Sequence, residues 1–278
     1  MWSACQAALV LECVINISEG RDQTTIDAIA AAAGSHLLDV HSDPHHHRSV
    51  LTVVGEEAPR AIAREAVARL DLTAHRGVHP RIGVVDVVPF VPLDLGAESS
   101  RGEDARGARD RFCRWAADTL DLPGFTYGPE RSLPDVRRNA FTALRPTCGP
   151  SSPHPTAGAV AIGARPVLVA YNVWVEDIDL EGARRVAAAL RGPGVRALGL
   201  PVGDRIQVSM NLTDPLHVGP ADVTDRIAER ATVAGCELVG LVPVAVLDAV
   251  AAPRWAELDL APDRTIEARL AAAGLRSA

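Results

Sequence analysis

The order of apolar patterns along the chain constrains its fold more than any other feature. In the N-terminal part, alternating or continuous apolar runs typical of strands are interspersed with 3.6-residue patterns typical of helices. They follow the order strand, helix, strand, strand, helix, strand, at residues 10–16, 21–34, 36–41, 48–55, 58–70 and 82–93. This order predicts a split β-α-β unit with the ferredoxin topology.

The same order returns in the C-terminal part of the chain. The predicted elements are a strand, a helix, two strands, a helix and a strand, at residues 166–175, 179–191, 195–202, 205–212, 221–235 and 236–244. A helix over 104–119 and a short strand near Tyr127 separate the two units, and a further helix is predicted at the C-terminus. We therefore expect an α/β fold, more narrowly an α+β sandwich of two ferredoxin-like βαββαβ subdomains. Their predicted extents are 1–168 and 169–278.

The charged residues narrow the chemistry, because the chain contains no lysine and all 28 of its basic residues are arginine. This excludes Schiff-base catalysis, P-loop phosphate transfer and Ser–Lys nucleophiles. Arginine binds carboxylates through a two-pronged fork, so small carboxylate ligands remain plausible. A net charge of −7 argues against a nucleic-acid partner. No apolar run reaches the roughly 18 residues that span a bilayer, which predicts no membrane partner.

The number and spacing of the cysteines indicate the cellular compartment of the protein rather than a fold held together by disulfides. Five cysteines are scattered along the chain without a C-x-x-C pair. Such a set favours a reducing, cytoplasmic location over a disulfide framework.

Histidines gather in the predicted turn "HSDPHHHRSV", residues 41–50, and again in "HRGVHPR", residues 75–81. Consecutive residues of an extended turn point in alternating directions, so at most two of the three histidines at 45–47 reach one ion. A zinc site needs three or four ligands. Pro80 disfavours a shared helix face for His75 and His79. A metal site and a solvated turn both remain open for the cluster, although no metal is expected.

General acid–base catalysis by histidine fits the second stretch better. The chain has no G-x-S-x-G elbow and no dinucleotide fingerprint, whereas imidazole titrates near neutrality. Asp86 interrupts the apolar strand that follows, and a buried carboxylate needs partners. Either an Asp86–His79 pair that sets the imidazole tautomer or a structural salt bridge to an arginine satisfies it.

Six ordered stretches carry a resemblance to a known family. They are "ECVINISEGRD", "LLDVHSDPHHHRSVLTVVG", "HRGVHPRIGVVDVVPFVPL", "GARPVLVAYNV", "QVSMNL" and "ELVGLVP". Together they resemble the formiminotransferase domain of glutamate formimidoyltransferase, in a form without the cyclodeaminase domain. The resemblance covers nearly the whole chain and implies two α/β subdomains with a tunnel between them. The implied reaction moves the formimino group of N-formimino-L-glutamate to N5 of tetrahydrofolate during histidine degradation.

The resemblance also implies roles for individual residues. The second histidine of the family's H-x-G-x-H-P-R motif is His79, the implied acid–base catalyst. The implied substrate-binding residues are Asn16, Ser18, Glu19, His41, His47, Arg48, Arg76, Asp86 and Tyr127. The implied folate-binding residues are Gly149, Pro150, Ser151, Ser152, Pro153, His154, Pro155, Thr156, Ala157 and Gly158. Tetrahydrofolate is the implied co-substrate, the other partners are small molecules, and a homodimer is implied.

The chain departs from the family at several positions that the resemblance places near substrate. His41 stands where the family usually has Asp, His47 where it has Asn, and Val78 where it commonly has Glu. Two of these changes remove a carboxylate from the implied site. A related one-carbon transferase with another formimino or formyl donor is therefore an alternative. A non-catalytic folate or amino-acid binding protein and a His-rich metallohydrolase are the rivals from other classes.

Overall fold

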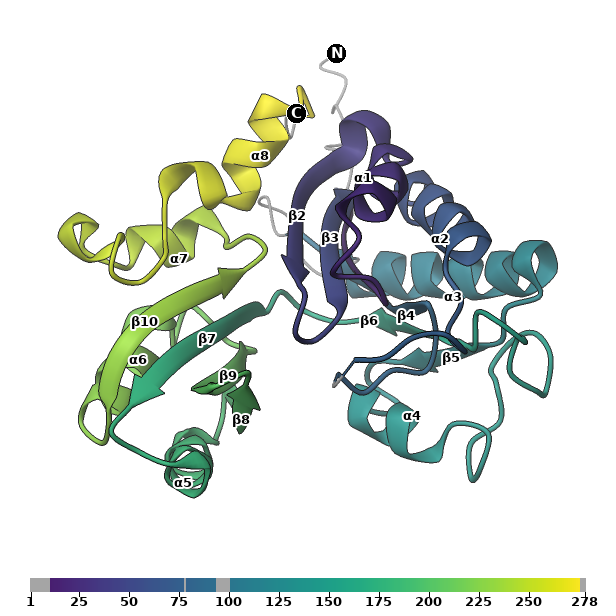
Figure 1. Ribbon diagram of the computed structural model, residues 1–278. Helices are drawn as coiled ribbons and strands as arrows, with labels where there is room; N and C mark the ends of the chain where they lie inside the picture. Colours follow the sequence, from purple (N-terminus) through teal and green to yellow (C-terminus); the bar gives the residue numbers. More distant parts are fainter. Residues whose placement is uncertain (1–10, 78, 94–100, 276–278) are drawn as a thin grey trace, which may run out of the picture. The chain divides into compact units, whose positions relative to one another are not determined.

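The computed structural model of the chain describes residues 11–77, 79–93 and 101–275 (Figure 1). The chain divides into two compact units that meet in the sequence between Pro166 and Val167. Each unit contains one β-sheet with helices packed against it. The predicted α+β fold is confirmed, and both ferredoxin-like strand orders are present.

The sheet of the first unit has the strand order β2-β3-β1-β4-β6-β5. Neighbours among the first four strands run antiparallel, in the predicted ferredoxin order. Strands β6 and β5 extend the sheet by parallel pairing, β6 beside β4 and β5 beside β6. The strands are β1 (Leu11–Ile17), β2 (Leu37–Asp43), β3 (Arg48–Val54), β4 (Val85–Pro92), β5 (Gly124–Tyr127) and β6 (Val160–Ala164).

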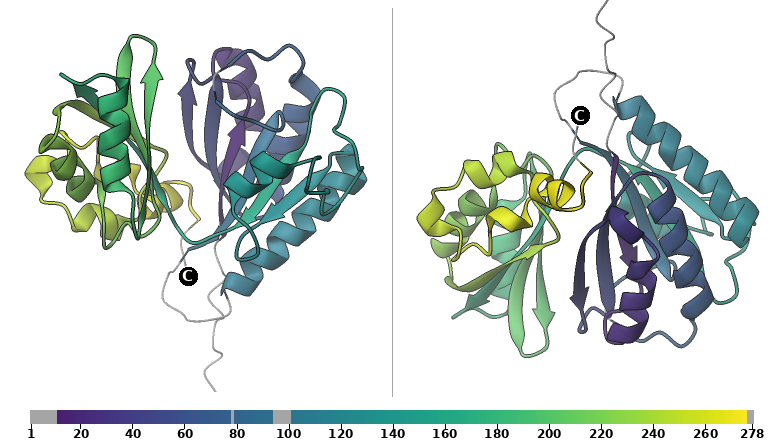
Figure 2. Two further views of the ribbon diagram at one scale, coloured as in Figure 1. Left: turned by 90° about the horizontal axis from the view of Figure 1, so that it is seen from below. Right: turned by 90° about the horizontal axis from the view of Figure 1, so that it is seen from above.

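Helices cover both faces of part of this sheet. Helices α1 (Gln23–Ala31), α2 (Glu57–Arg69) and α3 (Arg101–Leu120) lie side by side along one face (Figure 2). Helix α4 (Leu133–Asn139) packs against β5 and β6 from the other face, and η1 (Gly34–His36) precedes β2. The side chains of β4 point alternately to the two faces of the sheet. Val88 and Phe90 join the core under α1–α3, whereas Val87 joins the core under α4.

The second unit is a complete βαββαβ module. Its antiparallel sheet has the order β10-β7-β9-β8. Its elements are β7 (Val169–Glu176), α5 (Leu180–Leu190), β8 (Val195–Val202), β9 (Arg205–Leu212), α6 (Pro220–Ala228) and β10 (Thr232–Val239). Short helical segments follow, namely α7 (Val244–Asp248), η2 (Ala252–Arg254), η3 (Pro262–Arg264) and α8 (Ile266–Ala272). The single C-terminal helix predicted from sequence is therefore divided.

Side-chain capping hydrogen bonds explain where helices α1 and α4 begin. The side chain of Asp22 accepts hydrogen bonds from the backbone N–H groups of Thr24 and Thr25 and so caps α1. Ser132 and Asp135 form a reciprocal capping box at the start of α4. The sequence patterns missed both α4 and β6, because a seven-residue helix and a five-residue apolar strand are too short for a clear period.

Two strand boundaries also differ from prediction. Strand β10 begins at Thr232 rather than at Cys236, since the residues assigned to the end of a helix pair with β7 through a register shift between Val233 and Gly235. Strand β4 begins at Val85 rather than at Ile82. The three residues before it instead contact the segment that leads into β6.

Candidate functional site

Three predicted site loops converge at one edge of the first sheet because of strand direction. The register pairs Ile17, at the end of β1, with Ser49 near the start of β3 and with Val85 at the start of β4. The loop after β1, the turn between β2 and β3, and the segment before β4 therefore meet at this edge. We call it the turn edge and define it by residues 18–22, 43–48 and 75–86, without Val78, which lies outside the described residues.

The loop after β1 is held by its own acidic residue. One carboxylate oxygen of Glu19 accepts hydrogen bonds from the backbone N–H groups of Gly20, Arg21 and Asp22, at 2.7–3.0 Å. The Ser18 hydroxyl donates to the carbonyl oxygen of Gly83 at 2.8 Å. A Cβ on Gly20 would lie 2.4 Å from the carbonyl oxygen of Asp43, so glycine permits this close approach of two loops. Ser18 and Glu19 thus shape the turn edge.

The turn between β2 and β3 is organised around Asp43. One oxygen of its carboxylate accepts the backbone N–H groups of His45 and His46, and the other lies 2.5 Å from Nδ1 of His46. Burial acts to raise the pKa of Asp43, but these hydrogen bonds outweigh it and hold the pKa well below its usual range. Asp43 is therefore ionised at neutral pH, and it orients the ring of His46.

His47 has a left-handed backbone conformation, with φ of 52°. Asn, Asp and His are the residues that most often adopt this region apart from glycine. Its Nδ1 accepts the Gly20 N–H at 3.1 Å, and its ring stacks on His75 at a centroid distance of 4.1 Å. Burial lowers the pKa of His47. His47 therefore suits this backbone, as would the Asn that the resemblance implies at this position.

His79 lies against two other side chains of the turn edge. Its Nε2 is 2.8 Å from a terminal nitrogen (Nη1) of Arg48, and its ring meets that of His46 edge-on at a centroid distance of 6.3 Å. Burial lowers the pKa of His79 to about 2, and the nearby charge of Arg48 acts in the same direction. The ring is neutral at physiological pH, as a general base must be before it accepts a proton.

Arg81 fastens the two histidine loops to each other. Its guanidinium donates to the carbonyl oxygen of His79 at 2.6 and 3.0 Å and to that of His46 at 3.3 Å. It also contacts the ring of His75, whose Nε2 is 3.0 Å from the carbonyl oxygen of His47. Arg81 therefore sets the distance between the turn at 45–47 and the His79 loop.

Asp86 is the extra residue of a β-bulge in β4. Asn16 and Ile17 are consecutive in β1, but their partners Val87 and Val85 are not. A bulge redirects one side chain, and here the carboxylate accepts the Ile82 N–H at 2.8 Å and pairs with Arg137 of α4. Burial raises the pKa of Asp86, and the charges of Arg137 and Arg48 oppose this rise.

The sequence left open whether Asp86 pairs with His79 or with an arginine, and the structure shows the arginine pair. The carboxylate pairs with an arginine that sequence analysis did not single out, and no pairing with His79 is among its described hydrogen bonds. A salt bridge between residues 51 positions apart leaves no periodic signal in the sequence. The only available hint was the need of a buried carboxylate for a cation.

The segment Gly149–Gly158 reaches the turn edge from the neighbouring strands. It runs from beside the start of β5, where Gly124 bridges to Cys148, to the start of β6. Its final residues join the segment before β4, because the N–H of Val84 donates to the carbonyl oxygen of Ala157 at 2.9 Å. The Leu72 N–H likewise donates to the carbonyl oxygen of Thr156 at 2.7 Å. The implied folate segment and the His79 loop thus lie side by side.

His154 stabilises this segment from within. Its Nδ1 accepts the N–H groups of Thr156 and Ala157, at 3.3 and 3.0 Å, and its backbone pairs with Gly158. The exposed residues of the segment are Gly149, Ser151, Ser152, Pro153, Pro155 and Thr156, with Pro150 and His154 half-buried and Ala157 and Gly158 buried. Most of the segment is therefore available to a ligand.

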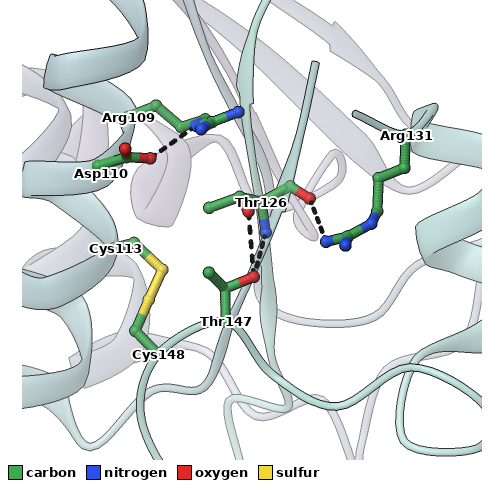
Figure 3. Close-up of a disulfide and its surroundings, with 7 residues drawn as sticks. All are labelled: Arg109, Asp110, Cys113, Thr126, Arg131, Thr147 and Cys148. Carbon is green, nitrogen blue, oxygen red and sulfur yellow. Dashed lines mark hydrogen bonds and ion pairs between the residues drawn. A yellow bond between two sulfur atoms is a disulfide. The ribbon is translucent and has the colours of Figure 1, made fainter. Parts of the chain in front are cut away.

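A disulfide fastens the beginning of the same segment. Cys148, directly before Gly149, is bonded to Cys113 of α3 (Figure 3). The neighbouring hydroxyl of Thr147 accepts the N–H of Thr126 at 3.1 Å. The scattered cysteines were not expected to form a disulfide framework, and this pair nevertheless forms one disulfide. Two cysteines 35 positions apart on a helix and a loop carry no spacing motif that sequence analysis can use.

Several predicted residues lie elsewhere or have other partners. Tyr127 ends β5, in register with Gly163 of β6 and Pro89 of β4, and is 6% exposed within the core under α4, where the charges of Arg137 and Asp86 act on its hydroxyl. Arg76 is exposed and donates to the carbonyl oxygens of Thr73 and His75. Asn16 is the second-to-last residue of β1, close to the turn edge, and His41 lies in β2 opposite Val50. The structure therefore brings Arg48, His47, Glu19 and His79 together but not Tyr127.

Neither a metal-binding group nor a membrane-spanning helix is present in the part of the chain that the structure describes. Over residues 11–77, 79–93 and 101–275, no three His, Cys, Asp or Glu side chains form a group that could hold a metal ion. Within the same residues, no helix has both the length and the apolar character needed to cross a bilayer.

Known proteins similar to this chain include glutamate formimidoyltransferases and formimidoyltransferase-cyclodeaminases. A family model for the formiminotransferase domain, N-terminal subdomain, matches residues 10–165. The glutamate formimidoyltransferase of Streptococcus pyogenes is 35% identical over 88% of this chain and 92% of that protein. That of Thermoplasma acidophilum is 34% identical over 87% and 91%. The formimidoyltransferase-cyclodeaminase of Sus scrofa is 35% identical over 87% of this chain, which spans about half of that longer protein.

Proposed function

The chain belongs to the formiminotransferase family, and from that premise we propose that it is a glutamate formimidoyltransferase. It transfers the formimino group of N-formimino-L-glutamate to N5 of tetrahydrofolate, the co-substrate. The observation that carries this proposal is the backbone pairing of the Gly149–Gly158 segment with the segment that follows His79. A folate bound on the first segment brings its reactive nitrogen to the turn edge.

His79 is the acid–base residue of the proposed reaction. The N5 atom of tetrahydrofolate attacks the formimino carbon, and a tetrahedral intermediate forms as the ring of His79 accepts the N5 proton. The same ring then returns a proton to the glutamate nitrogen as the carbon–nitrogen bond to glutamate breaks. The products are 5-formiminotetrahydrofolate and glutamate. Holding both substrates at one edge of the sheet supplies much of the rate acceleration.

The remaining proposed contacts follow the same geometry. Arg48 is the proposed partner of a glutamate carboxylate, since a guanidinium fork matches a carboxylate. His47, Glu19 and Ser18 shape the part of the turn edge that we propose binds the formimino donor. We also propose subdomains over 1–168 and 169–278, a homodimer, and a cytoplasmic enzyme that acts on small molecules. Light scattering of the purified protein tests the dimer.

A donor assay with a matched variant tests this function. The protein is incubated with tetrahydrofolate and formiminoglutamate, and release of glutamate is followed. We expect His79→Gln to lower kcat by roughly 10²–10⁴, the usual contribution of general acid–base catalysis. His217→Gln is the control, because His217 is exposed and pairs only with Asp214 among its described hydrogen bonds. Equal kcat in wild type and His79→Gln would remove His79 from the mechanism.

The same assay separates the alternative donor. His41 and His47 stand where the family has Asp and Asn, so a formyl donor or a formimino donor of another amino acid is the second candidate. If N-formylglutamate or formiminoglycine is processed with a higher kcat/KM than formiminoglutamate, the transfer reaction stands and the donor changes. Tetrahydrofolate binding without turnover of any of the three donors indicates a binding protein.

A further inference from the structure

The contact between Arg48 and His79 fixes the position of the imidazole proton. A guanidinium carries five N–H donors and no acceptor. Because Nη1 of Arg48 lies 2.8 Å from Nε2 of His79, Nε2 must be the acceptor in this hydrogen bond. The proton of the neutral ring is therefore on Nδ1.

This arrangement leaves His79 without a free acceptor. The lone pair of Nε2 is engaged by Arg48, and Nδ1 already carries the ring proton. The burial of the ring and the charges of Arg48, Arg137, His46 and Arg81 also hold the pKa of His79 at about 2. A base in this condition takes up no proton until Arg48 leaves Nε2.

The surroundings of Arg48 indicate what would draw it away. Arg48, Arg81 and Arg137 lie near one buried carboxylate, Asp86, which already pairs with Arg137. Asp43, the next carboxylate, is bonded to His46. Around Arg48, three arginines including Arg48 itself therefore face two carboxylates, Asp86 and Asp43.

Two buried N–H groups without a described acceptor also indicate that an anionic ligand binds here. The Nε atoms of Arg48 and Arg137 are both buried and have no hydrogen-bond partner among the described residues. A carboxylate is an acceptor with two oxygens, and arginine binds it with two parallel N–H groups. An anionic carboxylate would therefore supply both the missing acceptors and the missing negative charge.

We propose that Arg48 is a positioning residue that occupies Nε2 of His79 in the free enzyme and moves onto a carboxylate of the donor, which releases Nε2. This inference rests on the proposed role of His79 as the base. The freed Nε2 accepts the proton of tetrahydrofolate N5 while the N5–carbon bond forms. The same Nε2 proton passes to the glutamate nitrogen as its bond to carbon breaks, and the ring returns to its Nδ1–H form. The base is thus competent only when the donor is bound.

Nitrogen-15 NMR of the histidine rings tests this directly. The His79 signals are assigned by their loss in His79→Gln, and L-glutamate, the carboxylate product, is the probe. In the free enzyme we expect the Nδ1–H tautomer and no titration between pH 8 and 5. Saturating glutamate should raise the His79 pKa far enough that the ring titrates within this pH range, since an opposite charge offsets that of Arg48. The His217 signals, from the second unit, should not change, and sodium chloride at equal ionic strength should have no effect.

Two variants sharpen the test. In Arg48→Met, the His79 pKa without glutamate should be higher than in wild type, because only the charge of Arg48 is removed while burial still lowers it, and the pKa should no longer respond to glutamate. Arg48→Lys retains a charge and a donor, so the Nδ1–H tautomer should persist, whereas the weaker single-point contact should reduce the response to glutamate. This variant also introduces the chain's single lysine.

Specific results would overturn the proposal. They are an Nε2–H tautomer in the free wild-type enzyme, or a His79 pKa that saturating glutamate leaves unchanged. The wild-type titration alone decides this, so the proposal remains testable if Arg48→Met does not fold. If either result occurs while His79→Gln lacks transfer activity, the proposed function stands and only the role of Arg48 fails. If His79→Gln retains full activity, the proposed function of His79 fails, and this inference fails with it.

Discussion

Arg137 of α4 pairs with the carboxylate of Asp86 on β4, and this carboxylate is 1% exposed. Its partner arginine is 21% exposed. The pair joins the short helix α4 to the β-bulge at the start of β4, the strand that follows the His79 loop. Stability of the turn edge should therefore depend on an element that does not itself belong to the edge.

Replacing Arg137 with Leu should lower the free energy of unfolding by ~3 kcal/mol, because it leaves a buried carboxylate without its main partner. Urea denaturation measures this. Arg138→Leu is the control on the same helix: Arg138 is 69% exposed and pairs with an exposed Asp135, so its loss should cost about 0.5 kcal/mol or less. Equal destabilisation by both variants would contradict a special role for the Asp86 pair.

Acidification should destabilise the protein through its neutral histidines. Burial holds the pKa of His79 at about 2 in the folded state, whereas an unfolded histidine binds a proton below about pH 6.5. The unfolded state therefore binds more protons between pH 6.5 and 5, and stability must fall as pH falls. The contribution of His79 approaches ~1.4 kcal/mol per pH unit.

The pKa values of His47 and His75 are also lowered by burial and add in the same direction. Urea midpoints of wild type and His79→Gln between pH 7.5 and 5 isolate the contribution of His79. The variant should show the smaller decrease. Parallel curves for the two proteins would mean that His79 is protonated in the folded state.

Sequence patterns were sufficient for the two βαββαβ units but not for the whole first sheet or for the side-chain partners within the site. Both βαββαβ orders follow from the spacing of apolar residues, because each strand and helix buries one face. The placement of the three turn-edge loops then follows from strand direction alone. The extra strand β6 and helix α4 were missed because each is short, α4 covering about two helical turns and β6 five residues that are all buried, so neither shows a clear alternation of apolar and polar residues.

The side-chain contacts depend on long-range geometry instead. Arg48 meets His79 across 31 positions, and this contact exists only because β3 and β4 start at the same edge. The family motif predicted a catalytic role for His79, but nothing local to Arg48 predicted that its guanidinium faces an imidazole rather than a ligand. The bulge at Asp86 likewise became visible only through the register of β1 with β4.

Reduction of the Cys113–Cys148 disulfide should destabilise the first unit. The bond closes a loop with a sequence separation of 35, and the loss of such a constraint costs about 3 kcal/mol. Denaturation with and without a dithiol measures the change, and thiol titration should detect two additional thiols per chain after reduction. The Cys113→Ser/Cys148→Ser double variant should be insensitive to the dithiol. An identical response of wild type and double variant would contradict the bond.

The left-handed backbone at His47 should decide which substitutions are tolerated there. His47→Asn keeps a residue that adopts φ near 52° and should change stability by less than about 0.5 kcal/mol. His47→Val places a branched side chain in the same conformation and should cost ~2 kcal/mol. Thermal unfolding of both variants tests this. Similar melting temperatures for the Asn and Val variants would show that the backbone does not limit this position.

Gly158 should be essential to the pairing of the proposed folate segment with residues 82–84, which lead from His79 into β4. Its φ is 73°, and a Cβ would lie 2.3 Å from the carbonyl oxygen of Ile82. Gly158→Ala therefore combines left-handed strain with a clash against backbone, and should cost more than ~2 kcal/mol and raise the KM for tetrahydrofolate.

Gly34→Ala is the matched control in the same unit. Gly34 has a φ of 55°, but nothing lies within 4 Å of its added Cβ, so only the strain of about 1 kcal/mol remains. Its KM for tetrahydrofolate should equal that of wild type. If Gly158→Ala raised the KM no more than Gly34→Ala does, close contact between the two segments would not be needed for folate binding. In that case the backbone pairing at residues 82–84 would serve stability alone.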